Sequence, residues 1–122
     1  MISNEDFIDK EFREADELIV KLHELVKSME VTHPYEGADL MKDYLHTVYA
    51  LAEKEHMIHT RLSLSDDFLM QAMKTNMEEA LRERGMKTNE HPLTFFGRVK
   101  NDALESLKAL DPEAFTEYEN QS

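Results

Sequence analysis

Apolar residues recur along most of the chain at the spacing of an amphipathic helix. They fall on one face over residues 4–30, from residue 38 or 39 to about 64, from about 66 to 84, and from 89 to 110. A period near 3.6 residues is typical of helices that bury one side. No alternation of the kind seen in β-strands interrupts it. The pattern therefore predicts four helices.

Proline and glycine mark the expected boundary between the first two helices. The segment VTHPYEGA, residues 31–38, contains Pro34 and Gly37. Proline disfavours helix at the residue before it, and glycine supplies the freedom that a turn needs. We expect this segment to be the first loop, with the second helix beginning near Ala38 or Asp39.

Short polar residues mark the starts of the last two helices. Ser65 precedes two aspartates and is the expected cap of the third helix, because its oxygen can accept from the first amides and carboxylates favour the positive end of a helix. Gly85 lies where a left-handed residue would end that helix. Thr88 or Asn89 is the expected cap of the fourth helix, which tolerates Pro92 in its first turn.

These elements predict an all-α fold. Short connections between helices favour an antiparallel up-down four-helix bundle. A short C-terminal tail helix is expected after Asp111 and Pro112. A chain of 122 residues fits one domain. We expect a single helical domain over residues 1–122, with an acidic tail that frays from about residue 112.

The charge of the chain favours some partners over others. Acidic residues number 26 and basic residues 14, which gives a net charge of −12. Such a charge on average repels nucleic-acid phosphates and anionic lipids. Acidic residues gather in residues 1–17 and 111–122, as a solvated face or as a docking surface. We expect a basic protein partner, with no direct nucleic-acid contact and no membrane contact.

Signals for export are absent from the sequence. The start of the chain has neither a basic region nor an apolar one, and no segment approaches the roughly 18 apolar residues of a membrane span. The chain has no cysteine, as is common in reducing compartments. We expect a cytoplasmic protein.

The common catalytic signatures are also absent. No serine lies in a G-x-S-x-G turn, and the three glycines do not form a phosphate-binding loop. Glu53 and His56 have the E-x-x-H spacing of ferritin-like di-metal proteins, but the chain holds no second such pair. We therefore expect a non-enzymatic chain without a cofactor or a ferritin-like metal centre.

One polar cluster is predicted inside the bundle. Glu55 and His59, spaced i and i+4, share the apolar face of their helix, and Glu11 lies within the stripe of the first helix. A hairpin that turns near Pro34 brings residue 11 level with about residue 58. Lys100 falls within the last stripe. A Glu11, Glu55, His59 and Lys100 network is predicted, either as a structural cluster or as a metal or ligand site.

Three aromatic residues are candidates for contacts with other molecules. Phe95 falls off the apolar stripe of its helix and is expected to be exposed. Phe115 and Tyr118 lie in the expected tail helix. An exposed aromatic ring can anchor a partner, and it can also bury itself against a second copy across a two-fold axis. A homodimer is therefore a further expectation.

The segment Arg61-Leu62-Ser63-Leu64-Ser65-Asp66-Asp67-Phe68, followed by Leu81 and the Gly85-Met86 pair, resembles a family of short uncharacterised proteins of cyanobacteria and their phages. In that family an R-x-x-L-S-D-D-F segment precedes a helix that ends in a Gly-Met pair. The resemblance is loose over residues 14–110 and specific over 61–86, and the loop at 32–35 and the HPLTFFG segment depart from it. It implies a bacterial or phage cytoplasmic protein, and it transfers no functional residues.

Three functions are consistent with these features. The first is a non-enzymatic interaction or modulator protein, of phage or cyanobacterial origin, that binds a larger host assembly. The second is a small metal- or ligand-binding bundle that uses Glu11, Glu55 and His59. The third is an acidic nucleic-acid mimic, which the interspersed basic residues disfavour. We expect the first.

Overall fold

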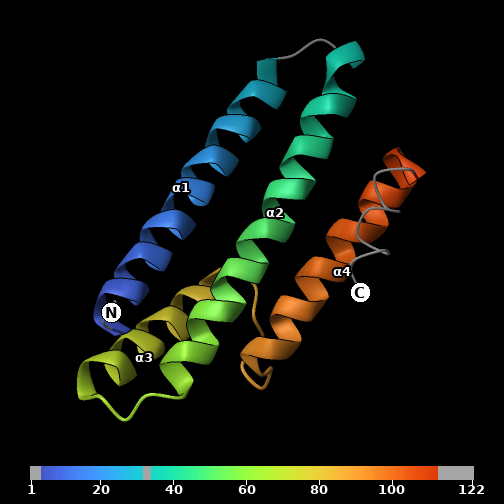
Figure 1. The fold of residues 1–122 in the computed structure, drawn as a ribbon. Helices are drawn as coiled ribbons and strands as arrows, with labels where there is room; N and C mark the ends of the chain where they lie inside the picture. The colour runs from blue at the N-terminus through green and yellow to red at the C-terminus, as the bar shows by residue number, and fades with distance from the viewer. Residues whose placement is uncertain (1–3, 32–33, 113–122) are drawn as a thin grey trace.

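The computed structural model describes residues 4–31 and 34–112, with side chains over 6–31 and 37–112. Within those residues it contains four helices and no strand: α1 (Asn4–Val31), α2 (Pro34–Ser63), α3 (Phe68–Glu83) and α4 (Pro92–Leu110) (Figure 1). The predicted all-α four-helix bundle is confirmed. The predicted tail helix, with Phe115 and Tyr118, lies outside the described residues.

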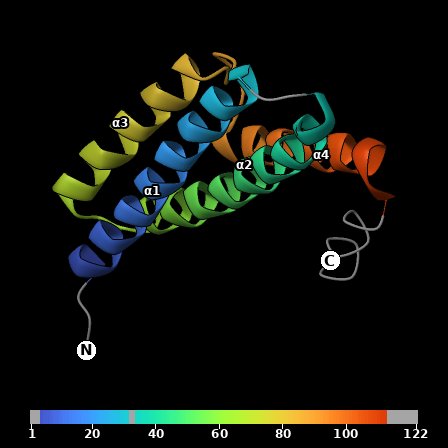
Figure 2. The same cartoon turned by 90° about the horizontal axis from the view of Figure 1, so that it is seen from above.

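Helix α2 is the centre of the bundle. α1 and α4 flank it along its length, and both run antiparallel to it (Figures 1 and 2). α3 packs on the half of α2 that leads to its C-terminus. Because α3 has 16 residues and α2 has 30, α3 spans roughly 24 Å of the roughly 45 Å that α2 covers. None of the described helices has an apolar stretch long enough to span a membrane.

Helix α2 begins at Pro34, earlier than the sequence pattern predicted. Residues 34–38, expected to be loop, are its first turn. The physical reason is that the first amides of a helix have no partner within it, so proline loses nothing at that position, and its fixed φ suits a helix. The position of the first loop was therefore predicted correctly, but the loop is shorter than predicted.

The caps of α3 and α4 also differ from the prediction. Asp67, rather than Ser65, caps α3: its carboxylate accepts from the amides of Leu69 and Met70 at 2.9 and 3.2 Å. Ser65 instead supports the capping residue, because its hydroxyl oxygen accepts a hydrogen bond from the Asp67 amide at 3.1 Å. His91, rather than Thr88 or Asn89, caps α4 through its Nδ1.

Gly85 ends α3 as predicted. Its φ is +116°, in the region that favours glycine. The amide of Met86 donates to the Leu81 carbonyl at 3.0 Å and the amide of Gly85 to the Arg82 carbonyl at 3.1 Å, which are the two hydrogen bonds of a Schellman motif. Leu81 and Met86 are both buried beside this turn. The turn directs the chain toward the start of α4.

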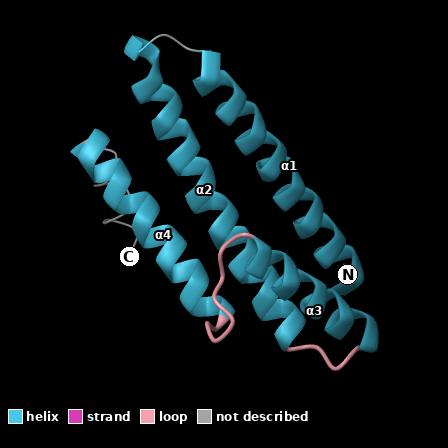
Figure 3. Cartoon of the chain, turned by 180° about the vertical axis from the view of Figure 1, so that it is seen from behind, coloured by secondary structure: helices cyan, strands magenta, loops and turns pink. Residues whose placement is uncertain are grey.

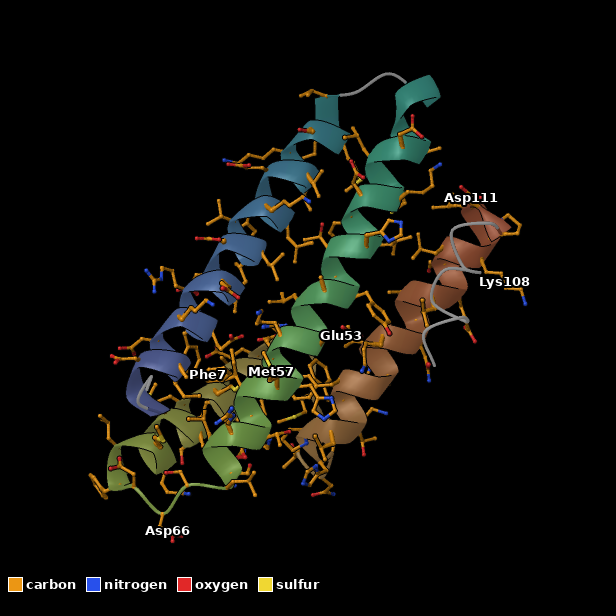
Figure 4. All side chains as sticks on the ribbon, in the orientation of Figure 1. Phe7, Glu53, Met57, Asp66, Lys108 and Asp111 are labelled. Carbon is orange, nitrogen blue, oxygen red and sulfur yellow. The ribbon has the colours of Figure 1, made fainter. Side chains whose placement is uncertain are left out.

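The core extends along α2, mainly in its C-terminal half. The larger group of buried residues consists of Ile8, Ala15, Leu51, Ile58, Leu62, Met70, Met77, Leu81, Met86, Phe95 and Phe96. A smaller group, Leu45, Ala103 and Leu107, joins α2 to the second half of α4. Polar side chains such as Asp66 in the α2–α3 loop and Lys108 near the end of α4 project outward (Figure 4).

The prediction that Phe95 is exposed is wrong, since only 3% of it is accessible. Its ring packs at 6.1 Å from that of Phe96, and the Arg98 guanidinium lies over its other side, 5.3 Å from the ring centre. The prediction was wrong because it assumed that only one face of α4 is buried, whereas the first turns of α4 are also buried outside the face that contacts α2. Phe95 is therefore a core residue.

Candidate functional site

Three charged or titratable residues predicted to point inward are buried. Glu11 is 5% exposed, Glu55 7% and His59 3%. Burying such groups is costly unless each has a partner. Glu11 accepts a hydrogen bond of 2.8 Å from Lys54, and Glu55 accepts two from Arg84. The inward orientation was predicted correctly.

These residues do not form the predicted joint cluster. His59 Nε2 lies 3.1 Å from Glu78 Oε1 on α3, so each of the three buried groups has its own partner. Lys100 lies 5.8 Å from the centre of the Tyr49 ring instead. Within the described residues, no group of three or more histidine, aspartate or glutamate side chains is arranged to hold a metal ion. The helical periodicity predicted which side chains of α2 point inward, but it did not predict which side chains of the other helices they contact.

Lys54 is the centre of a small charged network between α1 and α2. Its ammonium group also donates to Glu14 at 2.5 Å. This hydrogen bond lowers the pKa of Glu14 below its usual value. The hydrogen bonds to Glu11 and Glu14 together raise the pKa of Lys54. The network therefore fixes the register of the α1–α2 hairpin electrostatically.

Within the described part of the chain, Glu53 and His56 belong to no group of three or more potential metal ligands. Glu53 is exposed on the face of α2 turned away from α3, as is Met57 (Figure 4). His56 stacks on the ring of Phe96, with centroids 5.8 Å apart. Burial, followed by the charge of Lys100, lowers the pKa of His56. Its role is that of a packed aromatic residue.

A groove opens where α3 ends. Residues 48, 52, 55 and 59 of α2 are spaced by four, three and four, so they share one face. His59 and Glu55 meet side chains from α3 and the residue after it, whereas Val48 and Ala52 line an open groove of about 420 Å³. Figure 3 shows that no described helix lies over this part of α2 between α1 and α4.

The groove is lined mainly by apolar side chains. Its walls and floor are Ile19, Leu22, His23 and Val26 of α1, Tyr44, Val48, Leu51, Ala52 and Glu55 of α2, Phe95, Phe96 and Val99 of α4, and Arg84. Glu55 and Arg84 neutralise each other at the end where α3 stops. The uncovered length is the difference between 30 and 16 residues, or about 20 Å at the rise of an α-helix. Grooves of this kind bind amphipathic helices.

A second cavity lies near the end of the bundle where α2 finishes. It measures about 630 Å³ and is bounded by the last turns of α2, one face of α3 and the loop that leads into α4. It shares no residue with the groove. The sequence pattern indicated neither site, although the difference in predicted helix lengths was a signal for the groove.

Known proteins provide no guide to which site is used. No protein-family model, curated protein or solved structure matches the chain. The residues themselves therefore carry what can be inferred about function.

Proposed function

We propose that this chain is a non-enzymatic interaction protein that binds an amphipathic helix of a protein partner in the groove between α1 and α4. The main support is that the groove continues the position that α3 occupies. A helix of the chain's own already packs against the neighbouring stretch of the same α2 face, and Met77 and Leu81 are buried there. A partner helix with an apolar stripe would extend this packing over the next three or four turns.

Charge indicates the nature of the partner helix. The chain carries −12, and α1, which forms one wall of the groove, has nine acidic and four basic residues, with most of the acidic ones in the turns that precede the groove. A helix whose apolar stripe is flanked by lysine or arginine would complement the net charge of the chain. The chain's own residues 113–122, EAFTEYENQS, and a second copy of the chain are both acidic, so they fit less well. The resemblance to cyanobacterial and cyanophage proteins favours a partner within a cytoplasmic host assembly.

A pair of designed peptides tests this proposal. One is a 14-residue helix of leucine and lysine with leucine at i, i+3, i+4 and i+7, a length that matches the uncovered part of α2 at about 1.5 Å per residue. The other replaces each lysine by glutamate. Isothermal titration calorimetry is expected to show saturable binding of the lysine peptide and much weaker binding of the glutamate peptide. Equal binding of the two would contradict the charge argument, and no binding of either would contradict the proposal.

Two matched variants locate the binding surface. Val26 at the rim of the groove and Met57 on the opposite face of α2 are 39% and 38% exposed, so arginine is tolerated at both. Val26→Arg should weaken binding of the lysine peptide on the order of tenfold or more, through lost apolar contact and like-charge repulsion. Met57→Arg should leave it unchanged. Equal effects of the two variants would place the peptide elsewhere.

A further inference from the structure

The cavity beside α3 contains two cations, Lys74 and Arg82, for which the described part of the chain provides no ion pair. It is lined on the α3 side by Lys74, Glu78 and Arg82, on α2 by His59 and Ser63, and on the loop into α4 by Glu90 and His91, among others. Neither Lys74 nor Arg82 forms an ion pair within the described part of the chain. A concave surface with uncompensated positive charge attracts anions.

The carboxylates of the same cavity are already engaged. Glu90 accepts hydrogen bonds of 3.1 and 3.0 Å from Arg98 and one of 3.1 Å from the Lys87 amide. The Arg98 hydrogen bond lowers the pKa of Glu90, which keeps it ionised and paired. Glu78 lies 3.1 Å from His59 Nε2. Because a neutral His59 leaves the charge of Glu78 in place, Lys74 and Arg82 together outweigh Glu78, and a net positive charge is left to a ligand.

Two histidines supply defined hydrogen-bonding groups. His91 Nδ1 accepts from the Leu93 amide at 3.1 Å, so the neutral ring carries its proton on Nε2. A carboxylate can only accept, so the Nε2–H of buried His59 donates to Glu78, and Nδ1 is left to accept from the Ser63 hydroxyl at 3.5 Å. The cavity thus contains two cations and an N–H donor from His91. The hydrogen bond between His59 and Glu78 supports one of its walls.

We propose that this cavity binds the phosphate or carboxylate group of a small organic anion, with Arg82 and Lys74 as its principal ligands. A guanidinium group matches either anion with two parallel hydrogen bonds, and an ammonium group adds a point charge. The volume of about 630 Å³ lies within the range of small-molecule sites. This site is independent of the groove and of the protein partner proposed for it.

Titration with inorganic phosphate, and separately with succinate, tests the proposal. Calorimetry measures affinity, and NMR follows the ring resonances of His59 and His91. Saturable binding of phosphate alone assigns a phosphate-bearing ligand, and saturable binding of succinate alone assigns a carboxylate. Binding of both leaves the shared anionic group as the recognised feature. If neither anion binds at millimolar concentration, or if binding shifts neither histidine, the proposal is overturned.

A charge-matched pair of double variants excludes non-specific attraction. Lys74→Ala with Arg82→Ala should reduce anion affinity on the order of tenfold or more, because charge-assisted hydrogen bonds are lost. Lys21→Ala with Lys27→Ala removes the same charge from exposed positions on α1 and should leave affinity unchanged. Circular dichroism checks that both variants stay helical, and Arg82→Lys, which keeps the charge, should bind at an intermediate affinity. Equal affinities of the two double variants would overturn the assignment.

Discussion

Arg84, at the C-terminal end of α3, donates hydrogen bonds of 2.6 and 2.7 Å to the two carboxylate oxygens of Glu55 on α2. Glu55 is almost fully buried, whereas the Arg84 side chain is 40% exposed. This pair joins the end of α3 to the middle of α2. It also marks the point where the covered half of the α2 face becomes the open groove.

Loss of Arg84 should destabilise the fold. Arg84→Met leaves the Glu55 carboxylate buried without a counter-charge, and because Arg84 is partly solvated we expect a decrease of about 1–3 kcal/mol in the free energy of unfolding. Urea denaturation measures it. Arg82→Met, two residues away and without an ion pair, is the control. The double variant Arg84→Met, Glu55→Met should regain most of the loss, and equal stability of the two single variants would show that the pair contributes little.

Two of the three glycines, Gly85 and Gly97, should respond in opposite directions to alanine. Outside its own local backbone, neither glycine has a heavy atom within 4 Å of where a Cβ would lie, so packing does not distinguish them. Gly85 has φ of +116°, and Gly85→Ala should cost about 1 kcal/mol in backbone strain. Gly97 lies within α4, and Gly97→Ala should stabilise by about 0.5–1 kcal/mol. Thermal unfolding of both variants checks the signs, and destabilisation by Gly97→Ala would mean that the groove wall needs flexibility there.

Truncation should cost more under α3 than in the groove. Leu81 is fully buried, and Leu81→Ala should lower the free energy of unfolding by about 2–5 kcal/mol. Leu22 lines the open groove and is only half-buried, so Leu22→Ala should cost about 1 kcal/mol. Chemical denaturation of the two variants compares them directly. Similar losses would indicate that the groove is closed in solution, for example by self-association.

The Lys54 network should make stability depend on pH at both extremes. Because the folded-state pKa of Glu14 lies below its ordinary value of 4.5, its contribution is complete above 4.5 and is lost as the pH falls through the folded-state pKa. Because the folded-state pKa of Lys54 lies above 10.5, its contribution is complete below 10.5 and is lost as the pH rises through the folded-state value.

Lys54→Met should therefore destabilise most between those limits. The difference from the unsubstituted chain in the free energy of unfolding, measured in urea over a pH series, should narrow toward both acid and alkali. Lys27→Met, at an exposed position of α1, should show a small difference that hardly varies with pH. A Lys54→Met difference that stays constant below pH 4.5 would contradict the assigned shift of Glu14.

The sequence predicted the number and type of helices because the apolar period is a local property. The predicted starts of α2 and α3 were wrong by a few residues. Pro34 begins α2, and Asp67 rather than Ser65 caps α3, because more than one residue in each segment can begin a helix. The burial of Glu55 and His59 followed from their spacing. Their partners could not be predicted in this way. Arg84 and Glu78 reach α2 from α3, and the periodicity of one helix does not indicate how two helices face each other.

The groove could not be predicted from helical periodicity alone. The predicted third helix was visibly shorter than the second, but only the packed arrangement shows which face of α2 is left without a neighbour. Phe95 illustrates the same limit: its burial depends on tertiary neighbours around the start of α4 rather than on the stripe of its own helix. The cavity for which we propose an anion is built from three elements, and none of them alone carries a pattern that predicts it.

The shortness of α3 also divides the bundle into two regions of unequal rigidity. Ile58 and Leu62 of α2 are buried in a cluster with residues of α1, α3 and α4, whereas Val48 lines the open groove. Backbone amides in the second region should exchange with deuterium through smaller, more frequent openings. Occupation of the groove would slow that exchange, because a bound partner helix would cover the part of α2 that α3 leaves open.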